Sequence, residues 1–289
     1  FMANLKEIRT RISSVTSTKQ ITSAMKMVAA AKLRKAQTSM ARILPYSDKM
    51  KDMLSVLCET LIEEGSPYTV KRENKNILAI AVASNKGLCG GFNSNISKAV
   101  VSFDSKICAE YPNAQIQYYC VGKKVAEMVE KHGLKVFKKD YDAVDSGAFD
   151  VAKNIANELA QLFLDGTFDK IYIISNKFVN AAVQNVEVQN FLPLDFKPEK
   201  QQFKNDYIFE PDKTEIINTV IPMWLSNMLY SIFTESCAGE HGARMTAMNK
   251  ATDNATELIK DLNLVYNKLR QASITNEIIE IVSGANAAK

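Results

Sequence analysis

The feature that most constrains the fold is a long run without helix breakers near the C-terminal end of the chain. From Ala243 to Ser283 there is neither proline nor glycine, so one helix of about 41 residues, roughly 60 Å long, is allowed. Along it, mostly apolar residues recur at alternating steps of three and four, which predicts one buried stripe. This series is Met245, Met248, Thr252, Ala255, Ile259, Leu262, Tyr266, Leu269 and Ser273. Helix propensity alone stabilises such a stripe too little, so a second long helix is needed as its partner.

The N-terminal stretch supplies that partner. Its apolar series is Leu5, Ile8, Ile12, Val15, Ile21, Met25, Val28, Leu33, Ala36, Met40, Ile43, Met50, Leu54, Leu57 and Leu61. If Pro45 only kinks this helix, it reaches about 85 Å. Alanines narrow its middle, so Ala29 and Ala30 are expected where the two helices approach most closely. Two helices of an ordinary bundle are the alternative, but the length without breakers favours an antiparallel coiled coil.

Between the two ends the hydrophobic period changes from helical to alternating elements. Strands are predicted at 77–83, 115–121, 134–137, 170–175 and within 179–192, and helices at 94–110, 123–132 and 148–164. This alternation predicts a Rossmann-like α/β domain with a mostly parallel sheet. The expected organisation is therefore a long antiparallel coiled coil of N- and C-terminal helices, residues 1–64 and 212–289, with an inserted α/β domain over 76–195. The last helix is expected to start near Lys213.

A glycine-rich loop after the first strand is the natural place to look for a phosphate site. However, Gly87, Gly90 and Gly91 fit neither dinucleotide-binding nor P-loop spacing, and no Lys-Ser or Lys-Thr follows them. A tight turn that requires positive φ explains the glycines better. Cys89 within the loop is either an exposed thiol or a small buried side chain. No cofactor is expected.

Residues for catalysis or metal binding are sparse in this sequence. With His132 and His241 as its two histidines, a metal site is not expected, and His241 is interpreted as a solvent-exposed helix cap. Five scattered cysteines favour reduced thiols over a disulfide framework. No apolar run approaches the length of a membrane span, and no signal peptide is recognised. A mechanical or structural role is therefore favoured over an enzymatic one.

Positive charge is concentrated at the N-terminal end, where eleven basic residues stand against four acidic ones up to Thr60. Such a helix invites comparison with nucleic-acid binders. No aromatic residue lies between Met2 and Pro45 to stack on bases, and the basic positions wind around the helix. Together they suit an acidic protein partner. Two rival functions stay open: a nucleotide-binding enzyme with helical extensions, tested by nucleotide titration, and a coiled-coil adaptor or nucleic-acid binder, tested by salt-sensitive affinity for DNA or RNA.

Several motifs follow one another along the chain, at Ile8-Arg9 and in residues 21–32, 87–93, 243–248, 251–255 and 264–277. Together these motifs resemble the gamma subunit of the bacterial F-type ATP synthase. The resemblance covers nearly the whole chain and is strongest at its ends. It implies the central rotor shaft that couples proton flow through the membrane ring to ATP synthesis or hydrolysis, a subunit without catalytic activity of its own.

The resemblance also implies partners and contact residues. The expected partners are the alpha/beta hexamer, the epsilon subunit and the membrane c-ring, with no nucleic acid and no membrane insertion. Contacts with the beta subunits are implied for Arg270, Gln271, Thr275, Asn276 (where the family usually has Gln), Met25 and Cys89. Contacts with the membrane rotor ring are implied for Tyr207 and Glu210. The implied location is the cytoplasmic side of the cell inner membrane, as a peripheral protein.

Overall fold

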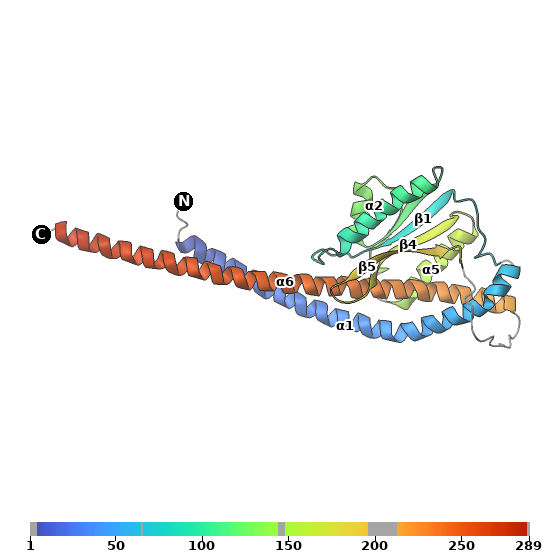
Figure 1. Cartoon of the computed structure of the whole chain (residues 1–289), viewed down its shortest axis with the longest axis horizontal. Helices are drawn as coiled ribbons and strands as arrows, with labels where there is room; N and C mark the ends of the chain where they lie inside the picture. Colours follow the sequence, from blue (N-terminus) through green and yellow to red (C-terminus); the bar gives the residue numbers. More distant parts are fainter. Residues whose placement is uncertain (1–4, 65, 144–147, 196–212, 288–289) are drawn as a thin grey trace. The chain divides into compact units, whose positions relative to one another are not determined.

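The computed structural model describes residues 5–64, 66–143, 148–195 and 213–287. Two long helices, α1 (Leu5–Glu64) and α6 (Lys213–Ala287), enclose the strands and shorter helices in the sequence (Figure 1). The chain divides into two compact units. The first holds the residues up to Ala29 and those from Met245 onward, and the second runs from Ala30 to Arg244. Tyr207 and Glu210 lie outside the described residues.

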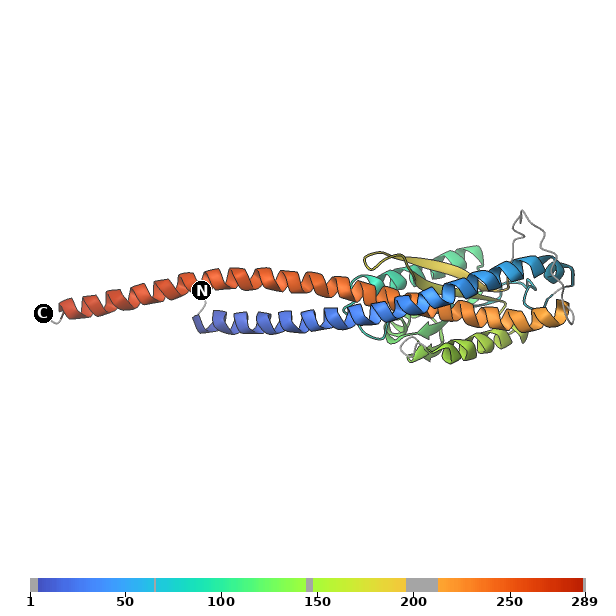
Figure 2. The same cartoon turned by 90° about the horizontal axis from the view of Figure 1, so that it is seen from below.

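In the first unit, the beginning of α1 lies antiparallel beside the part of α6 that follows Met245, and the last turns of α6 extend beyond α1 (Figures 1 and 2). The predicted stripe on α6 is confirmed, because all nine of its residues are buried or half-buried. Among them Met248 and Ala255 are buried, whereas the flanking Asp253 and Glu257 are exposed. The heptad pattern alone was therefore enough to identify the contact face of this helix.

Among the described side chains of α1, which do not include Leu57 and Leu61, the apolar series is wrong at two positions. Ile21 is 60% exposed and Val28 is 58% exposed, whereas their neighbours Thr22 and Ala29 are buried. Steps of three and four from Val15 lead to Thr22 and Ala29, so the geometry of the helix decides which residues face the partner. A polar threonine therefore occupies a contact position, and two large apolar side chains face outward.

Ala29 is 2% exposed and Ala30 is half-buried, which agrees with a narrow helix surface at this point. Replacing Ala29 with leucine is expected to overpack the contact and to lower the free energy of unfolding by about 1–3 kcal/mol. The matched control is Ala31→Leu, because Ala31 is exposed on the same helical turn. Thermal melts of both variants test this expectation. Equal melting temperatures for Ala29→Leu and the parent would contradict it.

A five-stranded sheet forms the centre of the second unit, with strand order β3-β2-β1-β4-β5. The strands are β1 (Asn76–Val82), β2 (Gln115–Val121), β3 (Val136–Asp140), β4 (Lys170–Phe178) and β5 (Gln184–Leu192). The first four run parallel, and β5 is antiparallel to β4. The Rossmann-like, mostly parallel prediction is thus confirmed. The third strand begins two residues later and ends three residues later than expected, at Val136–Asp140.

Helices cover both faces of this sheet, which explains why β1 is a continuous apolar run. On one face, Ile77 packs with residues of α2 (Phe92–Glu110) and α3 (Lys123–Lys131). On the other, Leu78 packs with α5 (Phe149–Leu164) and with Leu225, Leu229 and Phe233 of α6. Figure 1 shows α2 on one side of the sheet and α6 on the other. The C-terminal helix is therefore part of the core of the α/β unit.

Both long helices continue through a proline. α1 is helical for 60 residues with Pro45 inside it, and α6 for 75 residues with Pro222 inside it. The expected start of the last helix at Lys213 is confirmed. No described helix has the length and apolarity that crossing a bilayer requires.

Candidate functional site

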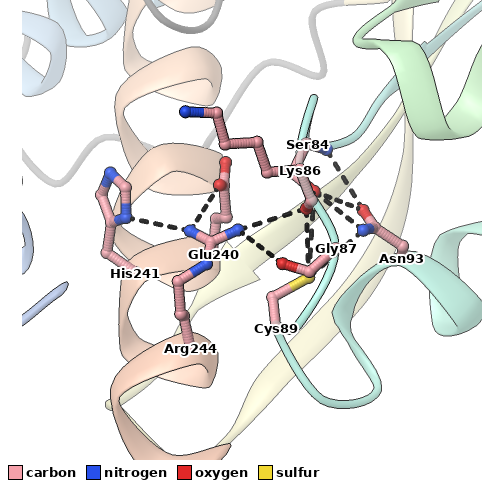
Figure 3. Close-up of polar contacts among 8 residues, drawn as sticks. All are labelled: Ser84, Lys86, Gly87, Cys89, Asn93, Glu240, His241 and Arg244. Carbon is pink, nitrogen blue, oxygen red and sulfur yellow. Dashed lines mark hydrogen bonds and ion pairs between the residues drawn. The ribbon is translucent and has the colours of Figure 1, made fainter. Parts of the chain in front are cut away.

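The loop between β1 and α2 is fastened to α6 by a buried arginine, and this attachment is the candidate functional site (Figure 3). Arg244 donates from Nη1 to Glu240 Oε1 at 2.7 Å. From Nη2 it donates to the carbonyl oxygens of Lys86 and Gly87, each at 3.2 Å. Arg244 is 9% exposed and Glu240 is 6% exposed, so the ion pair is largely shielded from water. We call these four residues the arginine clamp.

Within the loop, a second set of hydrogen bonds fixes its shape. Ser84 Oγ donates to the Lys86 carbonyl at 2.7 Å, and Asn93 Nδ2 contacts Ser84 Oγ at 2.8 Å and Cys89 Sγ at 3.2 Å. Cys89 is 2% exposed, so of the two predicted environments for this thiol the buried one is right. Gly90 has a φ of 58°, as expected for a tight turn that favours glycine. Leu88, which is 66% exposed, marks the outer surface of the loop.

The polarity of this loop argues against a nucleotide site. A phosphate cradle presents backbone N–H groups to an anion. Here the carbonyl oxygens of Lys86 and Gly87 face a guanidinium cation. In the described part of the chain, no cluster of histidine, cysteine and carboxylate side chains is arranged to hold a metal ion. The arrangement joins a sheet loop to a long helix mechanically.

His241 lies inside this site and not at a helix end. It is half-buried in the middle of α6, and its Nδ1 is 3.3 Å from Arg244 Nη1. The interpretation as a solvent-exposed cap is therefore wrong, because α6 begins 28 residues earlier, at Lys213. The sequence did contain a signal for the clamp: Glu240 stands four residues before Arg244, the spacing and order of a favourable helical ion pair.

Two glycines of α6 let neighbouring elements approach the helix closely: the turn between β4 and β5 at Gly242, and α2 at Gly239. A Cβ atom on Gly242 would lie 3.0 Å from Ala181 Cα, and one on Gly239 would lie 3.3 Å from Phe92 Cε2. Both are in the part of α6 that carries the clamp. The turn itself is ordered by Asn180, whose Oδ1 accepts the backbone N–H groups of Ala182 and Val183.

Replacing Gly242 with alanine is expected to destabilise the protein, although alanine favours a helix over glycine by about 1 kcal/mol. Backbone atoms of Ala181 must move to admit the new methyl group, which costs about 1–3 kcal/mol. The matched control is Gly284→Ala, since an added Cβ at Gly284 of the same helix meets nothing within 4 Å. Chemical denaturation should show a loss for Gly242→Ala and no loss for Gly284→Ala. Stabilisation by both substitutions would contradict the proposed close approach.

Glu235 is a half-buried acid on α6 near the same hairpin. Burial raises the pKa of this carboxyl above its ordinary value, and the nearby Glu187 carboxylate raises it as well. Lys177 and a hydrogen bond from the Ser231 hydroxyl lower the pKa, but by less than burial raises it. Lys177 also pairs with Glu187 at 3.1 Å. Because the folded state holds the proton on Glu235 more tightly than the unfolded chain does, folding gains stability as pH falls from neutral through the raised pKa.

Replacing Glu235 with glutamine is therefore expected to raise the melting temperature at pH 7 and to lose this advantage as the pH falls. Melting curves of the variant and the parent across pH 4 to 8 measure the difference. Glu280→Gln, on an exposed turn of the same helix, is the control for the loss of one charge. If the melting temperatures of Glu235→Gln and the parent differed by the same amount at every pH from 4 to 8, the raised pKa of Glu235 would be contradicted.

The residues implied as partner contacts occupy three different environments. Arg270, Gln271, Thr275 and Asn276 are all exposed on α6, within seven consecutive positions. The Thr275 hydroxyl donates to the Gln271 carbonyl at 2.9 Å, so both lie on the same face of the helix. Met25 is half-buried in the first unit, and Cys89 is buried in the second. Four of the six implied beta-subunit contacts therefore lie close together on α6, whereas Met25 and Cys89 lie on other elements.

Two polar contacts cross between the helices of the first unit. Thr22 Oγ1 and Thr252 Oγ1 are 2.8 Å apart, and Lys26 Nζ donates to Asn249 Oδ1 at 2.6 Å. Asn249 Nδ2 in turn donates to Asp253 Oδ2 at 3.1 Å. The sequence did not identify Lys26 and Asn249 as contact residues, because the contact positions were predicted from apolar side chains and these two polar residues flank the predicted stripes.

Comparisons with known proteins match nearly the whole length of this chain. A family model described as ATP synthase matches residues 4–288. The chain is 50% identical over 287 residues to an ATP synthase gamma chain of Christiangramia forsetii, covering 99% of each chain. It is 50% identical over 288 residues to that of Flavobacterium johnsoniae, again covering 99% of each. It also resembles a chain in a structure of the Euglena gracilis mitochondrial ATP synthase, with a TM-score of 0.67, 21% identity, and coverage of 98% of this chain and 94% of that one.

Proposed function

The chain belongs to the family of ATP synthase gamma chains, and from this membership we propose that it is the central rotor shaft of an F-type ATP synthase. It is a non-catalytic subunit of a complex that is bound to a membrane. The observation that carries the mechanism is the pairing of two long helices, one of which is also built into the core of an α/β unit. This arrangement suits the transmission of mechanical work.

Such a shaft has to make identical catalytic sites behave differently. A conformational preference requires a difference in interaction free energy between the states. An asymmetric pair of helices inside a ring of alternating alpha and beta subunits supplies that difference, because each beta subunit meets a different side of the pair. Moving one charge across 100 mV yields about 2.3 kcal/mol. The work of several protons must therefore be transmitted through the shaft to release one tightly held ATP.

The arginine clamp is the element that passes work from the α/β unit to α6. Its contacts join the loop of residues 86–87 directly to the helix, and the close approach of Ala181 to Gly242 adds a second attachment nearby. Because the ion pair of the clamp is shielded from water, removing one of its partners costs more than it does in an exposed ion pair.

Contacts with the beta subunits are proposed at three places. One is the exposed group of Arg270, Gln271, Thr275 and Asn276. Another is Met25 in the first unit, and a third is the loop of the second unit that contains Cys89. The buried Cys89 serves this contact by holding the loop, whose outer surface is Leu88. The excess of basic residues up to Thr60 suits an acidic lever of the beta subunits.

The segment with Tyr207 and Glu210 is proposed to meet the membrane rotor ring. The epsilon subunit is a further proposed partner. The proposed location is the cytoplasmic face of the cell inner membrane, with the protein attached peripherally. The proposed division of labour is a shaft of residues 1–64 and 212–289, with residues 76–195 as the domain through which torque enters.

Co-expression with alpha and beta subunits tests the proposal. A tagged chain should purify together with a hexameric ring of the two, and the reconstituted complex should couple ATP hydrolysis to proton pumping. Calorimetry on the isolated chain should show no saturable ATP binding in the micromolar range. Failure to purify with the ring, or saturable ATP binding by the chain alone, would overturn the proposal.

A further inference from the structure

The two polar contacts of the first unit, Thr22 with Thr252 and Lys26 with Asn249, define one alignment of its helices. In an antiparallel pair, residues that face each other have numbers with a nearly constant sum, and here the two sums are 274 and 275. This alignment places Ile12 opposite Leu262 and Val15 opposite Ile259. All four of these apolar side chains are half-buried, as that alignment requires.

The apolar residues alone do not distinguish this alignment from one displaced by a heptad. With α1 moved seven residues along α6, Ile12 would face Leu269 and Val15 would face Tyr266, so apolar side chains would meet again. The same displacement brings Thr22 opposite Ile259 and Lys26 opposite Thr256. The hydrogen bond between the two threonine hydroxyls and the hydrogen bond from Lys26 to the Asn249 amide would then be lost, and each such bond contributes to stability. Each threonine hydroxyl would keep its bond to a carbonyl oxygen of its own helix.

We infer that Thr22, Thr252, Lys26 and Asn249 form a register lock, a set of positioning residues that hold the two helices of the first unit in one axial alignment. Polar residues within an otherwise apolar helix pair are known to specify alignment. The inference rests on the proposed shaft function in one respect: a rotor under load has to transmit work without its helices slipping past each other. The alignment itself is a property of the isolated chain.

Cysteine cross-linking of the full chain measures the alignment, in a background where the exposed Cys108 is serine. One reporter pair, Ile12→Cys with Leu262→Cys, links in the observed alignment. The other, Ile12→Cys with Leu269→Cys, links only after a heptad displacement. With the lock intact, mild oxidation should link the first pair and leave the second largely unlinked.

The lock is then removed by Thr22→Val, Thr252→Val, Lys26→Leu and Asn249→Leu. The linked fraction of the displaced reporter pair should rise about tenfold, the factor that corresponds to losing roughly 1.4 kcal/mol of polar contact. The control carries the same four types of change at exposed positions of the same helices: Thr18→Val, Thr256→Val, Lys32→Leu and Asn254→Leu. It should link like the parent.

An unchanged linking pattern after removal of the lock would overturn the inference, and so would an equal rise in the control. If the fourfold variant loses helicity, the isosteric pair Thr22→Val with Thr252→Val is measured in its place, and the same two outcomes decide. Since the assay needs no other subunit, its failure leaves the shaft function standing. Failure of the chain to purify with alpha and beta subunits would likewise leave the register lock standing.

Discussion

Replacing Arg244 with alanine is expected to be the most destabilising of the changes considered, lowering the free energy of unfolding by about 3–5 kcal/mol. The substitution removes the cation from a shielded pair and leaves the Glu240 carboxylate, 6% exposed, without it. The carbonyl oxygens of Lys86 and Gly87 lose their guanidinium donor at the same time. Chemical denaturation of the isolated chain measures the loss, and proteolysis should become faster within the loop.

Two variants separate the clamp from a general effect of lost charge. Arg244→Lys keeps the cation but lacks the planar fork that reaches a carboxylate and two carbonyls together, so it should recover only part of the stability. Lys124→Ala removes an ion pair with Glu127 in which both side chains are more than a third exposed. It should cost no more than about 1 kcal/mol. If Arg244→Ala unfolded at the same denaturant concentration as Lys124→Ala, the clamp would have no special role.

Replacing Arg270 and Gln271 together with alanine is expected to leave the isolated chain folded and to impair the assembled enzyme. Both residues are exposed and lie outside the stripe of Leu262, Tyr266 and Leu269, so helicity and melting temperature should not change. Each hydrogen bond to a charged group that is lost in the complex costs about 1.5–3 kcal/mol. The loss should therefore appear in assembly, in the ATPase rate or in ATP-driven proton pumping.

The matched control replaces Asn267 and Lys268, an exposed polar and basic pair one turn earlier on the same helix, with alanine. It should assemble, hydrolyse ATP and pump protons like the parent. Normal behaviour of the Arg270 and Gln271 variant in all three assays would mean that this pair is only solvated surface. The beta-subunit contact would then have to be sought between Ile274 and Ile281.

The positions of the helices and strands could be predicted from the sequence because periodicity reports burial on one face. The Met245 to Ser273 stripe was predicted in full, and β2 was predicted at its observed bounds. The predictions were less successful where burial did not follow hydrophobicity. At Ile21 and Val28 the helix geometry assigns the contact positions to Thr22 and Ala29. β3 is only partly buried, so the weak alternation of an edge strand gave inaccurate bounds.

The clamp could not be predicted in the same way, because it joins residues more than 150 positions apart. The Glu240 and Arg244 spacing indicates an ion pair but not its burial. That the pair meets the Lys86 and Gly87 carbonyls depends on the packing of α6 against the sheet. Likewise, Gly239 and Gly242 indicate flexibility in a helix taken alone. Only the approach of Ala181 and Phe92 shows that the missing side chains make room for neighbours.

The end of α6 has a consequence for the protein before it is assembled. Every described residue from Ile274 to Asn286 is exposed, and Ile274, Ile278 and Ile281 follow the spacing of a single helix face. Their exposed fractions are 48%, 55% and 70%. An apolar stripe of this kind favours aggregation until a partner covers it. The free chain should therefore self-associate as its concentration rises, and its solubility in the cell should depend on how soon after synthesis its partners bind it.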